Sequence, residues 1–519
     1  MARITLTSLY SDLDNWPGRL FEGDPLPTVT VRTATTFSLT YPATHEFPGF
    51  RVVAVGTGFT YLDGEATGGV IDRIVVVDAA GNLVIRFDTF AAGALGADLA
   101  QFASNVFGWA LNGDGAGPDG KMTWNHLLSG NDVINGTSGD DDRVLVGVDR
   151  GNDIYNMLGG DDIIGGSMGN DTIYGGDGFD TITFRETSYS EGAAAYRGIS
   201  VNMTNQTLVD CWGNTDTFTG IERIEGSRFN DSMVGTDGRD QFAGLRGADF
   251  FDGGADQDRV RYQDDYWNGG RRGIVVDLET SIVGGRIFGT IRDGFGQTDR
   301  TVDVERVDGT RYNDVFVGSS VQNVFRGGEG RDSYSGGLGF DVINLDNGFT
   351  DVVQTGVVVN LSLATGQIVN DGYGNTENAT SFDEVWSGDS NDSIRGSTGG
   401  NFFWGNDGRD TLTGGGGNDD FYFDRLSEAG DGDIVTDFFA GSGANQDQIA
   451  FEIDNFTGMT ATVRLVNGTA ATTAGGTFVW NTTTDTLFWD VDGVGGAAQV
   501  ALVQLTGVGA LTVDNFNLF

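Results

Sequence analysis

A nine-residue repeat is the feature that most constrains what this chain can fold into. In the stretch Gly151–Phe184 an Asp recurs every nine residues, two positions after a Gly and two positions before an apolar or aromatic residue. The aspartates of this first block are Asp153, Asp162, Asp171 and Asp180. A fixed short period with glycine turns indicates a repeat architecture in which each unit stacks on its neighbours.

The same register recurs in three later blocks, and the first acids of successive blocks lie 78, 83 and 78 residues apart. The later members are Asp231, Asp240, Asp249, Asp258, Asp314, Asn323, Asp332, Asp341, Asp392, Asn401, Asp410 and Asp419. The two asparagines keep an oxygen ligand without its charge, so we expect weaker sites there. The middle of the chain is therefore a four-fold long repeat, and each copy carries four short repeats.

Each short repeat has two physical parts. The glycine-rich half turns tightly, because glycine reaches positive φ at no steric cost. The apolar half forms a short strand whose alternate residue points into a core. Stacked turns bring carboxylates face to face, which is unfavourable unless a cation lies between them. Carboxylate and carbonyl oxygens suit Ca²⁺, and two turn pairs per block predict roughly eight ions.

Further acids extend the register. One step of nine residues back from the later blocks lies an acid in each case, at Glu222, Glu305 and Asp383, which we predict as a fifth ligand position. The repeats begin earlier, at Asp132 and Asp141. After the last block we add Asp433 and Asp437 to the predicted metal ligands.

These residues resemble the RTX (repeats-in-toxin) nonapeptide, GGxGxD followed by any residue, an apolar residue and any residue. GGDGFDTIT at Gly175–Thr183 and GGGGNDDFY at Gly414–Tyr422 match it closely, whereas AGLRGADFF at Ala243–Phe251 lacks the double glycine. The resemblance covers roughly residue 129 to the C-terminus. It implies an all-β fold with a parallel β-roll or β-helix solenoid, several Ca²⁺ ions between stacked turns, and export by a type I secretion apparatus.

Composition restricts the partners. The chain has 74 acidic and 30 basic residues among 519, a formal charge of −44, which disfavours nucleic acid and anionic membrane as partners.

Cys211 is the only cysteine, so no intrachain disulfide forms, and stabilisation by metal fits an exported protein. The first residues lack the apolar run of a signal peptide, and no apolar run approaches the ~18 residues that a membrane helix needs.

Three domains are expected. Residues 1–128 lack the nonapeptide and predict a β-rich domain, with a strand at 51–61, a hairpin around 78–82 and a short helix through Leu95, Leu99, Phe102 and Val106. Residues 129–424 form the β-roll, in which alternating apolar residues of the spacers predict strands that add wider coils. Residues 425–519 form a C-terminal β cap that resembles the cap and secretion signal of RTX proteins, because a solenoid otherwise exposes its last coil.

No catalytic motif stands out. The chain has no HExxH, two histidines and one cysteine leave no Ser-His-Asp or Cys-His set, and the GxSxG match at Gly165–Gly169 lies inside the repeat.

We expect a non-enzymatic, structural or adhesive protein of the extracellular space or surface of a Gram-negative bacterium, which assembles with itself or binds surface polysaccharide. The alternatives are a polysaccharide-active enzyme and a carbohydrate-binding protein. The latter would use spacer aromatics, although core or rim packing is the simpler role for Trp212, Tyr262, Tyr266, Trp267 and Tyr373.

Overall fold

The structure is a computed structural model of the 519-residue chain. It describes residues 2–6, 28–32, 36–40, 51–62, 65–77, 83–89, 133–135, 151–185, 195–346, 355–425, 432–441 and 446–519. The chain divides into two compact units, Met1–Asp256 and Gln257–Phe519. Within the described residues the regular structure is β-strand with three short 3₁₀ helices, and the predicted all-β class is confirmed.

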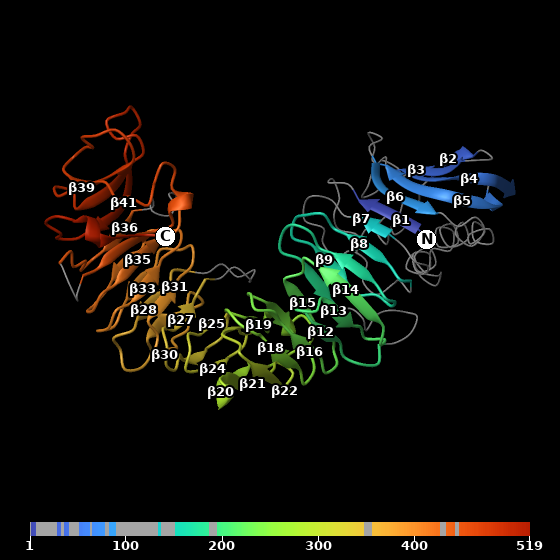
Figure 1. Ribbon diagram of the computed structural model, residues 1–519, viewed down its shortest axis with the longest axis horizontal. Coiled ribbons are helices and arrows are strands. Elements are labelled where there is room, and N and C mark those ends of the chain that lie inside the picture. Colours follow the sequence, from blue (N-terminus) through green and yellow to red (C-terminus); the bar gives the residue numbers. More distant parts are fainter. Residues whose placement is uncertain are drawn as a thin grey trace. The chain divides into compact units, whose positions relative to one another are not determined.

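An antiparallel sheet opens the first unit. Its strands are β1 (Ala2–Leu6), β2 (Thr28–Arg32), β3 (Thr36–Thr40), β4 (Arg51–Leu62), β5 (Glu65–Val77) and β6 (Leu83–Thr89). They pair in the order β2–β3–β4–β5–β6–β1 (Figure 1). The predicted strand at 51–61 and the antiparallel pairing on either side of 78–82 are confirmed. The predicted helix between Leu95 and Val106 lies outside the described residues.

A parallel β-roll follows in the first unit. Residues 18 apart pair in parallel, as Ile154 does with Thr172 and Ile163 with Thr181, so two nonapeptides make one coil. The strands are β7 (Val133–Asn135), β8 (Ile154–Asn156), β9 (Ile163–Gly165), β10 (Thr172–Tyr174), β11 (Thr181–Thr183), β12 (Ser200–Asn202), β13 (Thr207–Val209), β14 (Thr215–Thr219), β15 (Arg223–Glu225), β16 (Ser232–Val234), β17 (Gln241–Ala243) and β18 (Phe250–Asp252).

Two stacks of strands form the opposite walls of this roll. One stack contains β7, β8, β10 and β14, and the other contains β9, β11, β15 and β17. The middle residue of each three-residue strand points into the coil and is buried, as Tyr155, Ile164 and Ile182 are. The period-two alternation of a strand therefore explains why each repeat needs one apolar residue two positions after its Asp.

The second unit has the same architecture. Its strands are β19 (Arg259–Arg261), β20 (Val275–Val283), β21 (Arg286–Arg292), β22 (Thr298–Val302), β23 (Arg306–Asp308), β24 (Val315–Val317), β25 (Val324–Arg326), β26 (Ser333–Ser335), β27 (Val342–Asn344), β28 (Val358–Asn360), β29 (Ile368–Asn370), β30 (Asn378–Thr380), β31 (Glu384–Trp386), β32 (Ser393–Arg395), β33 (Phe402–Trp404), β34 (Thr411–Thr413) and β35 (Asp420–Phe423).

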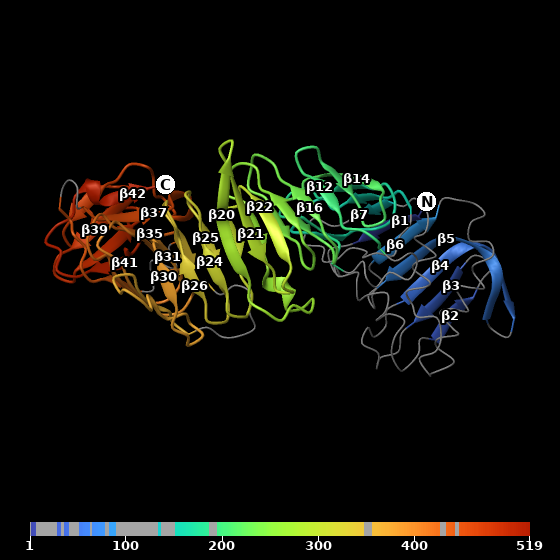
Figure 2. The ribbon, with the colours of Figure 1, turned by 90° about the horizontal axis from the view of Figure 1, so that it is seen from below.

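One parallel wall of this unit, here called the long stack, runs β19–β23–β25–β27–β31–β33–β35. The opposite wall contains β24, β26 and β30, which Figure 2 labels, and then β28, β32 and β34. Inward aromatic side chains fill the coils between the walls: Phe316 lies 5.1 Å from Phe325 and 5.0 Å from Tyr334, ring centroid to ring centroid.

The spacers are strands, as predicted, but they do not simply widen the coils. In each long repeat the chain leaves the parallel wall and returns through antiparallel neighbours, as in β12–β13–β14 and β20–β21–β22. The reversals are local hydrogen-bonded turns: Asp210 Oδ1 accepts the backbone N–H groups of Trp212 (2.9 Å) and Asn214 (2.7 Å). Asp293 and Asp371 form the same turn in the later spacers. The prediction of plain wider coils missed these reversals.

The C-terminal region adds the last strands. They are β36 (Asp433–Val435), β37 (Gln448–Phe451), β38 (Leu465–Asn467), β39 (Thr477–Asn481), β40 (Thr486–Asp490), β41 (Val500–Leu505) and β42 (Phe516–Leu518). Strands β37 and β42 extend the long stack beyond β35, and the β38–β41 sheet joins the opposite wall through β36. Phe478 packs against Phe451, Trp489 and Phe516, with ring centroids 4.5 to 5.3 Å apart. This arrangement covers the apolar interior at the end of the roll.

Candidate calcium-binding turns

Every register residue in the described repeat blocks lies in the turn directly before a strand. The register residues of stacked coils follow one another along the roll; this row is here called the ladder, and each residue in it is a rung. In most coils the backbone N–H of the register residue donates to the carboxylate one coil later: Asp153 to Asp171 Oδ1 at 2.8 Å, and Asp314 to Asp332 Oδ1 at 2.7 Å. The same bond links 162 to 180, 231 to 249, 323 to 341, 392 to 410 and 401 to 419. The stack therefore brings acids from adjacent coils together, as the nine-residue register predicts. Asp132 and Asp141 lie outside the described residues.

The acids predicted one step before each block join the same ladder. Glu222 accepts the N–H of Asp180 at 2.8 Å, and Glu305 accepts the N–H of Asp258 at 3.1 Å. Asp383 accepts the N–H of Asp341 at 3.4 Å. These three acids are half-buried and so differ from a solvated edge acid.

After the last block the two predicted acids take different places. Asp433 accepts the N–H of Asp410 at 2.8 Å and is a further rung of the ladder. Asp437 instead accepts the N–H groups of the turn glycines Gly414 (2.8 Å) and Gly415 (3.1 Å).

Sequence reasoning missed three rungs. Asp216 accepts the N–H of Asp171 (2.9 Å), Glu377 that of Asp332 (2.7 Å), and Asp447 that of Asp419 (3.0 Å). A signal for the first two was present, because Asn-Thr-Asp and Asn-Thr-Glu end the antiparallel turns of their spacers. Their distance from the neighbouring acids is not nine residues, since the spacer inserts antiparallel strands between them.

Fourteen of the sixteen register turns fall into two classes, and the residue four positions before the acid separates them. In the first class, here called serine/threonine turns, this residue caps the acid. Thr310 donates its N–H to Asp314 Oδ2 (2.7 Å) and its hydroxyl to Oδ1 (3.0 Å), and Ser227 caps Asp231 in the same way. Caps also occur from Ser167 to 171, Thr236 to 240, Ser319 to 323 and Ser397 to 401. Donors within the protein satisfy these acids.

In the second class, here called left-handed turns, the same position has positive φ. Eight such residues precede a register acid in the described blocks: Leu158, Gly176, Leu245, Gly254, Gly328, Gly337, Asn406 and Gly415. They give two left-handed turns in each of the four blocks. The left-handed conformation costs roughly 1–2 kcal/mol for a residue other than glycine, which explains why glycine predominates. Leu158, Leu245 and Asn406 show that the double-glycine motif is not required for the conformation.

Two left-handed turns bring oxygen atoms close together around a glycine. Asp180 Oδ2 and Asp341 Oδ2 are buried and accept no hydrogen bond. A Cβ on Gly175 would lie 1.8 Å from the carbonyl oxygen of Gly220 and 2.4 Å from Asp180 Oδ2. On Gly336 it would lie 2.0 Å from the Ser381 carbonyl oxygen and 2.6 Å from Asp341 Oδ2. Carboxylate and carbonyl oxygens thus converge beside a residue without a side chain, which fits a Ca²⁺ ion.

The electrostatics of these turns also fit a cation. Burial raises the pKa of Asp180 to about 6, and repulsion from Glu222 adds to the shift. Burial likewise raises the pKa of Asp341 to about 6, with repulsion from Asp383. In each pair the left-handed turn supplies one carboxylate and the next rung supplies the other. Among the described residues no group of three or more His, Cys, Asp or Glu side chains converges, so an ion at these turns would need backbone carbonyl oxygens as further ligands.

Asn323 and Asn401 both belong to serine/threonine turns. Asn323 Oδ1 accepts the N–H of Ser319 at 2.6 Å, and Asn401 Oδ1 accepts the N–H of Ser397 at 2.8 Å. The Nδ2 group of Asn401 donates to the Asp383 carbonyl oxygen at 3.1 Å. A neutral amide therefore satisfies this turn by hydrogen bonds, which is a physical reason why the charge is dispensable at these positions.

Comparison with known proteins agrees with this geometry. The family model for the RTX calcium-binding nonapeptide repeat matches residues 128–142, 149–182, 225–260, 308–343 and 386–421. No curated protein sequence matches the chain. Among solved structures, the extracellular lipase LipA from Serratia marcescens is similar at 13% identity and a TM-score of 0.20, over 94% of this chain and 83% of the lipase chain. The repeated part of the chain therefore consists of RTX calcium-binding nonapeptide repeats.

Proposed function

We propose that this chain is a secreted protein that folds on binding Ca²⁺ outside the cell and then acts as a structural or adhesive component of a surface layer, filament or matrix. The observation that carries the calcium part is the left-handed turn at Asp180 and at Asp341, where a buried carboxylate oxygen accepts no hydrogen bond and a carbonyl oxygen lies close by. A bound Ca²⁺ ion supplies the positive charge that these buried carboxylates otherwise lack.

The eight left-handed turns are the proposed ion sites. The serine/threonine turns are proposed to bind no metal, because hydrogen bonds from the serine or threonine stabilise their acids. Their ligands are the register acids of these turns, the acid of the next rung, and backbone carbonyl oxygens. This assignment gives two sites per block, and it makes the capped acids, such as Asp314, structural residues.

Export and folding are coupled in this proposal. Where Ca²⁺ is scarce, as in the cytosol, a chain of charge −44 repels itself and stays open for a type I secretion apparatus. Outside the cell, millimolar Ca²⁺ exceeds the ~10⁻⁴–10⁻³ M dissociation constants of extracellular calcium modules. Binding then drives folding, because the site does not exist in the open chain. RTX repeats of this kind are typical of proteins secreted by Gram-negative bacteria, and the described residues include no helix long and apolar enough to cross a bilayer.

An exposed aliphatic surface on the second unit supports a role in contact with another surface. Val275 and Val315 are directly paired across β20 and β24, and both are more than a third exposed. Val317 is similarly exposed on β24. Ile282 and Val283, 54% and 62% exposed, lie at the end of the β20–β21 hairpin (Figure 2). Exposed aliphatic residues gathered on adjacent strands are a feature of interaction surfaces.

A non-enzymatic role is part of the proposal. The one sequence match to a hydrolase motif has a structural explanation, because Ser167 is buried, donates its hydroxyl to Asp171 Oδ2 at 2.7 Å and lies 3.0 Å from the Tyr155 hydroxyl. Its oxygen is thereby committed to a serine/threonine turn. The predicted alternative, an extracellular polysaccharide-active enzyme, would be favoured by turnover that depends on acids outside the register.

Light scattering during a calcium titration from zero to about 10 mM tests the structural role, with electron microscopy of the endpoint. We expect ordered growth into sheets or filaments with Ca²⁺ and none with equal Mg²⁺. The double variant Ile282→Ser and Val283→Ser should weaken assembly and leave calcium-dependent folding intact, because both side chains project into solvent. A protein that folds with Ca²⁺ and stays strictly monomeric would overturn self-assembly.

A further inference from the structure

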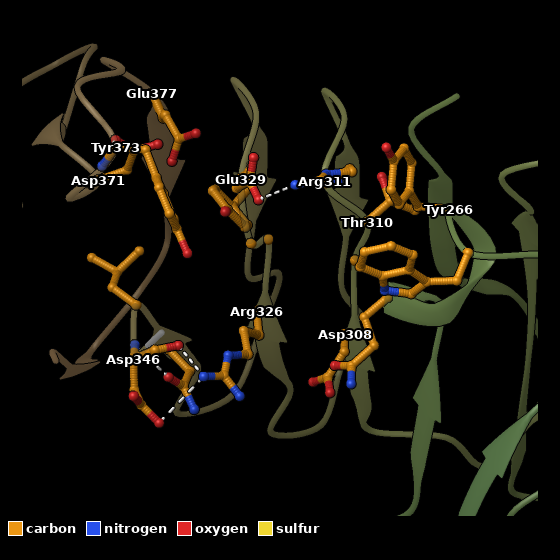
Figure 3. Close-up of a pocket in the computed structure, with 18 residues that line it drawn as sticks. Tyr266, Asp308, Thr310, Arg311, Arg326, Glu329, Asp346, Asp371, Tyr373 and Glu377 are labelled. Atoms are coloured by element: carbon orange, nitrogen blue, oxygen red, sulfur yellow. Dashed lines mark hydrogen bonds and ion pairs between the residues drawn. The ribbon is translucent and has the colours of Figure 1, made fainter. Parts of the chain in front are cut away.

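The second unit carries a cavity whose lining includes the left-handed-turn glycine Gly328 and the acid Glu377 but extends beyond the calcium turns to Tyr266 and Tyr373. It has a volume of about 300 Å³, at the lower end of the ~300–1,000 Å³ typical of small-molecule sites. Tyr266 lies toward one end and Tyr373 toward the other, with the ion pairs Arg311–Glu329 and Arg326–Asp346 between them (Figure 3). Aromatic ends with polar groups between them suit a ligand that has both apolar faces and many hydroxyl groups.

The cavity continues into a row of side chains on the outer face of the long stack. The third residues of β23, β25, β27, β31, β33 and β35 are in register across the wall. In order they are Asp308, Arg326, Asn344, Trp386, Trp404 and Tyr422. The first three line the cavity, and the last three are aromatic. One straight track therefore runs from the cavity along the aromatic half of the row.

The aromatic half of the row consists of Trp386, Trp404 and Tyr422, whose rings contact one another in sequence. The ring centroids of Trp386 and Trp404 are 5.8 Å apart, and those of Trp404 and Tyr422 are 5.5 Å apart, each pair edge to face. All three side chains are half-buried: the Arg306 guanidinium lies 5.7 Å from the centre of the Trp386 ring, and the Tyr422 ring also packs against Phe402 and Phe519. Successive strands of a wall repeat every ~4.8 Å, which gives the row a regular step comparable to the length of a sugar ring.

Exposed aromatic residues also occur at the cavity itself. Trp267 is 70% exposed and Tyr266 is 38% exposed, although large aromatic side chains usually bury most of their surface. Their rings contact edge to face at 5.0 Å, and the Arg311 guanidinium lies 4.1 Å from the centre of the Tyr266 ring. These contacts hold an aromatic surface in place at the mouth of the cavity.

The charges of the cavity disfavour an anionic ligand. Arg326 contacts the Asp346 carboxylate at 3.3 Å, and Arg311 contacts the Glu329 carboxylate at 2.7 Å. Asp308 is paired with arginines of β19. The arginines of the cavity are thus neutralised within the protein, and the chain as a whole is strongly acidic. Carboxylates and paired guanidinium groups instead offer acceptors and donors to neutral hydroxyl groups.

We propose that this face of the second unit binds a neutral polysaccharide, with sugar rings against Trp386, Trp404 and Tyr422 and further rings in the cavity beside Trp267. The inference deepens the adhesive role proposed above and rests on the calcium-folded solenoid, but it does not require self-assembly. It names the partner class as an uncharged glycan chain of several sugar rings.

The test uses the full chain saturated with Ca²⁺ and three soluble neutral probes: a β-linked glucan, an α-linked glucan and a galactomannan. Dextran sulfate serves as the anionic comparison. Binding is measured by calorimetry and by the change in tryptophan fluorescence. We expect at least one neutral probe to bind, and Trp404→Ala or Trp267→Ala to weaken its affinity about tenfold or more. Phe439→Ala is the matched control, since Phe439 is 56% exposed and stands outside the row.

The outcomes are distinguishable from a failure of folding. Each variant is first checked for the calcium-induced change in circular dichroism, and a wild-type chain that shows no such change would refute the proposed calcium-dependent function instead. A folded chain that binds none of the neutral probes overturns the glycan inference, as does one that binds dextran sulfate more tightly. Equal loss of affinity in Phe439→Ala also overturns it, because that change removes no residue of the row.

Discussion

At the scale of single residues, the position four before each register acid carries information that the acid itself does not. Serine or threonine there supplies hydrogen-bond donors to the carboxylate, whereas Asp180 and Asp341, which follow left-handed residues, each keep one buried oxygen that accepts no hydrogen bond. The acids look alike in the sequence because every one of them occupies the same register. Their environments differ because a buried carboxylate is stabilised either by donors or by a cation.

Substitution of one acid from each class tests this distinction. Asp341→Asn removes charge from a left-handed turn, so we expect one calcium site to be lost and the Ca²⁺ concentration at the folding midpoint to rise by roughly 3- to 10-fold. Asp314→Asn removes an acceptor from a serine/threonine turn, so it should cost about 1–3 kcal/mol of stability and leave the number of bound ions unchanged. Calorimetric calcium titration with thermal unfolding measures both. Equal loss of ions in the two variants would contradict the assignment.

The buried acids also predict a pH dependence. Burial raises the pKa of Asp180, Asp341 and Asp419 to about 6, against an ordinary value near 3.8. The calcium-free folded state therefore binds more protons than the unfolded state, and its stability is lost as pH rises from about 4 through 7.

We accordingly expect the calcium-free chain to gain β structure as pH falls from 8 to about 5, because protons replace the cation on these carboxylates. With Ca²⁺ present the midpoint concentration should rise as pH falls through the same range, since protons and Ca²⁺ compete. Circular dichroism at several pH values, with and without chelator, measures both trends. A calcium-free chain that is most folded at pH 8 would be incompatible with this explanation.

At the scale of elements, the nine-residue register was enough to predict the parallel stacking, the turn before each strand and the inward residue of each strand. It did not predict the antiparallel reversals of the spacers, because those depend on side-chain turns such as the one at Asp210, which have no fixed period. The rungs at Asp216 and Glu377 were missed for the same reason. The cavity beside Tyr266 was not predictable either, since its walls come from segments more than 100 residues apart in sequence.

Glycine substitutions test the two turn classes as elements. Gly337 has φ of +108°, and a Cβ there would lie 2.3 Å from the Ser319 carbonyl oxygen, so Gly337→Ala should destabilise the folded chain by about 1–3 kcal/mol. Gly399 lies in a serine/threonine turn, where a Cβ would meet only ordinary contact, and Gly399→Ala should be neutral or slightly stabilising. Thermal unfolding in saturating Ca²⁺ measures the loss of stability in each variant. An equal loss in Gly337→Ala and Gly399→Ala would contradict the distinction between the two turn classes.

At the scale of the whole molecule, charge and repetition determine the behaviour together. The chain carries −44 formal charges, and its repeats place many acids in buried ladders. A folded state of this kind is unfavourable without a cation and favourable with one, so a single ion type acts on many coils at once. Each coil contacts its neighbours along the stack, and folding should therefore be cooperative within each unit.

The most direct test is far-UV circular dichroism of the purified chain, titrated with Ca²⁺ from chelator to about 10 mM, with Mg²⁺ as the matched control. We predict a cooperative gain of β structure at sub-millimolar to millimolar Ca²⁺, reversed by chelator and not reproduced by Mg²⁺. A chain with the same β-rich spectrum and the same thermal transition in chelator as in Ca²⁺ would contradict calcium-driven folding.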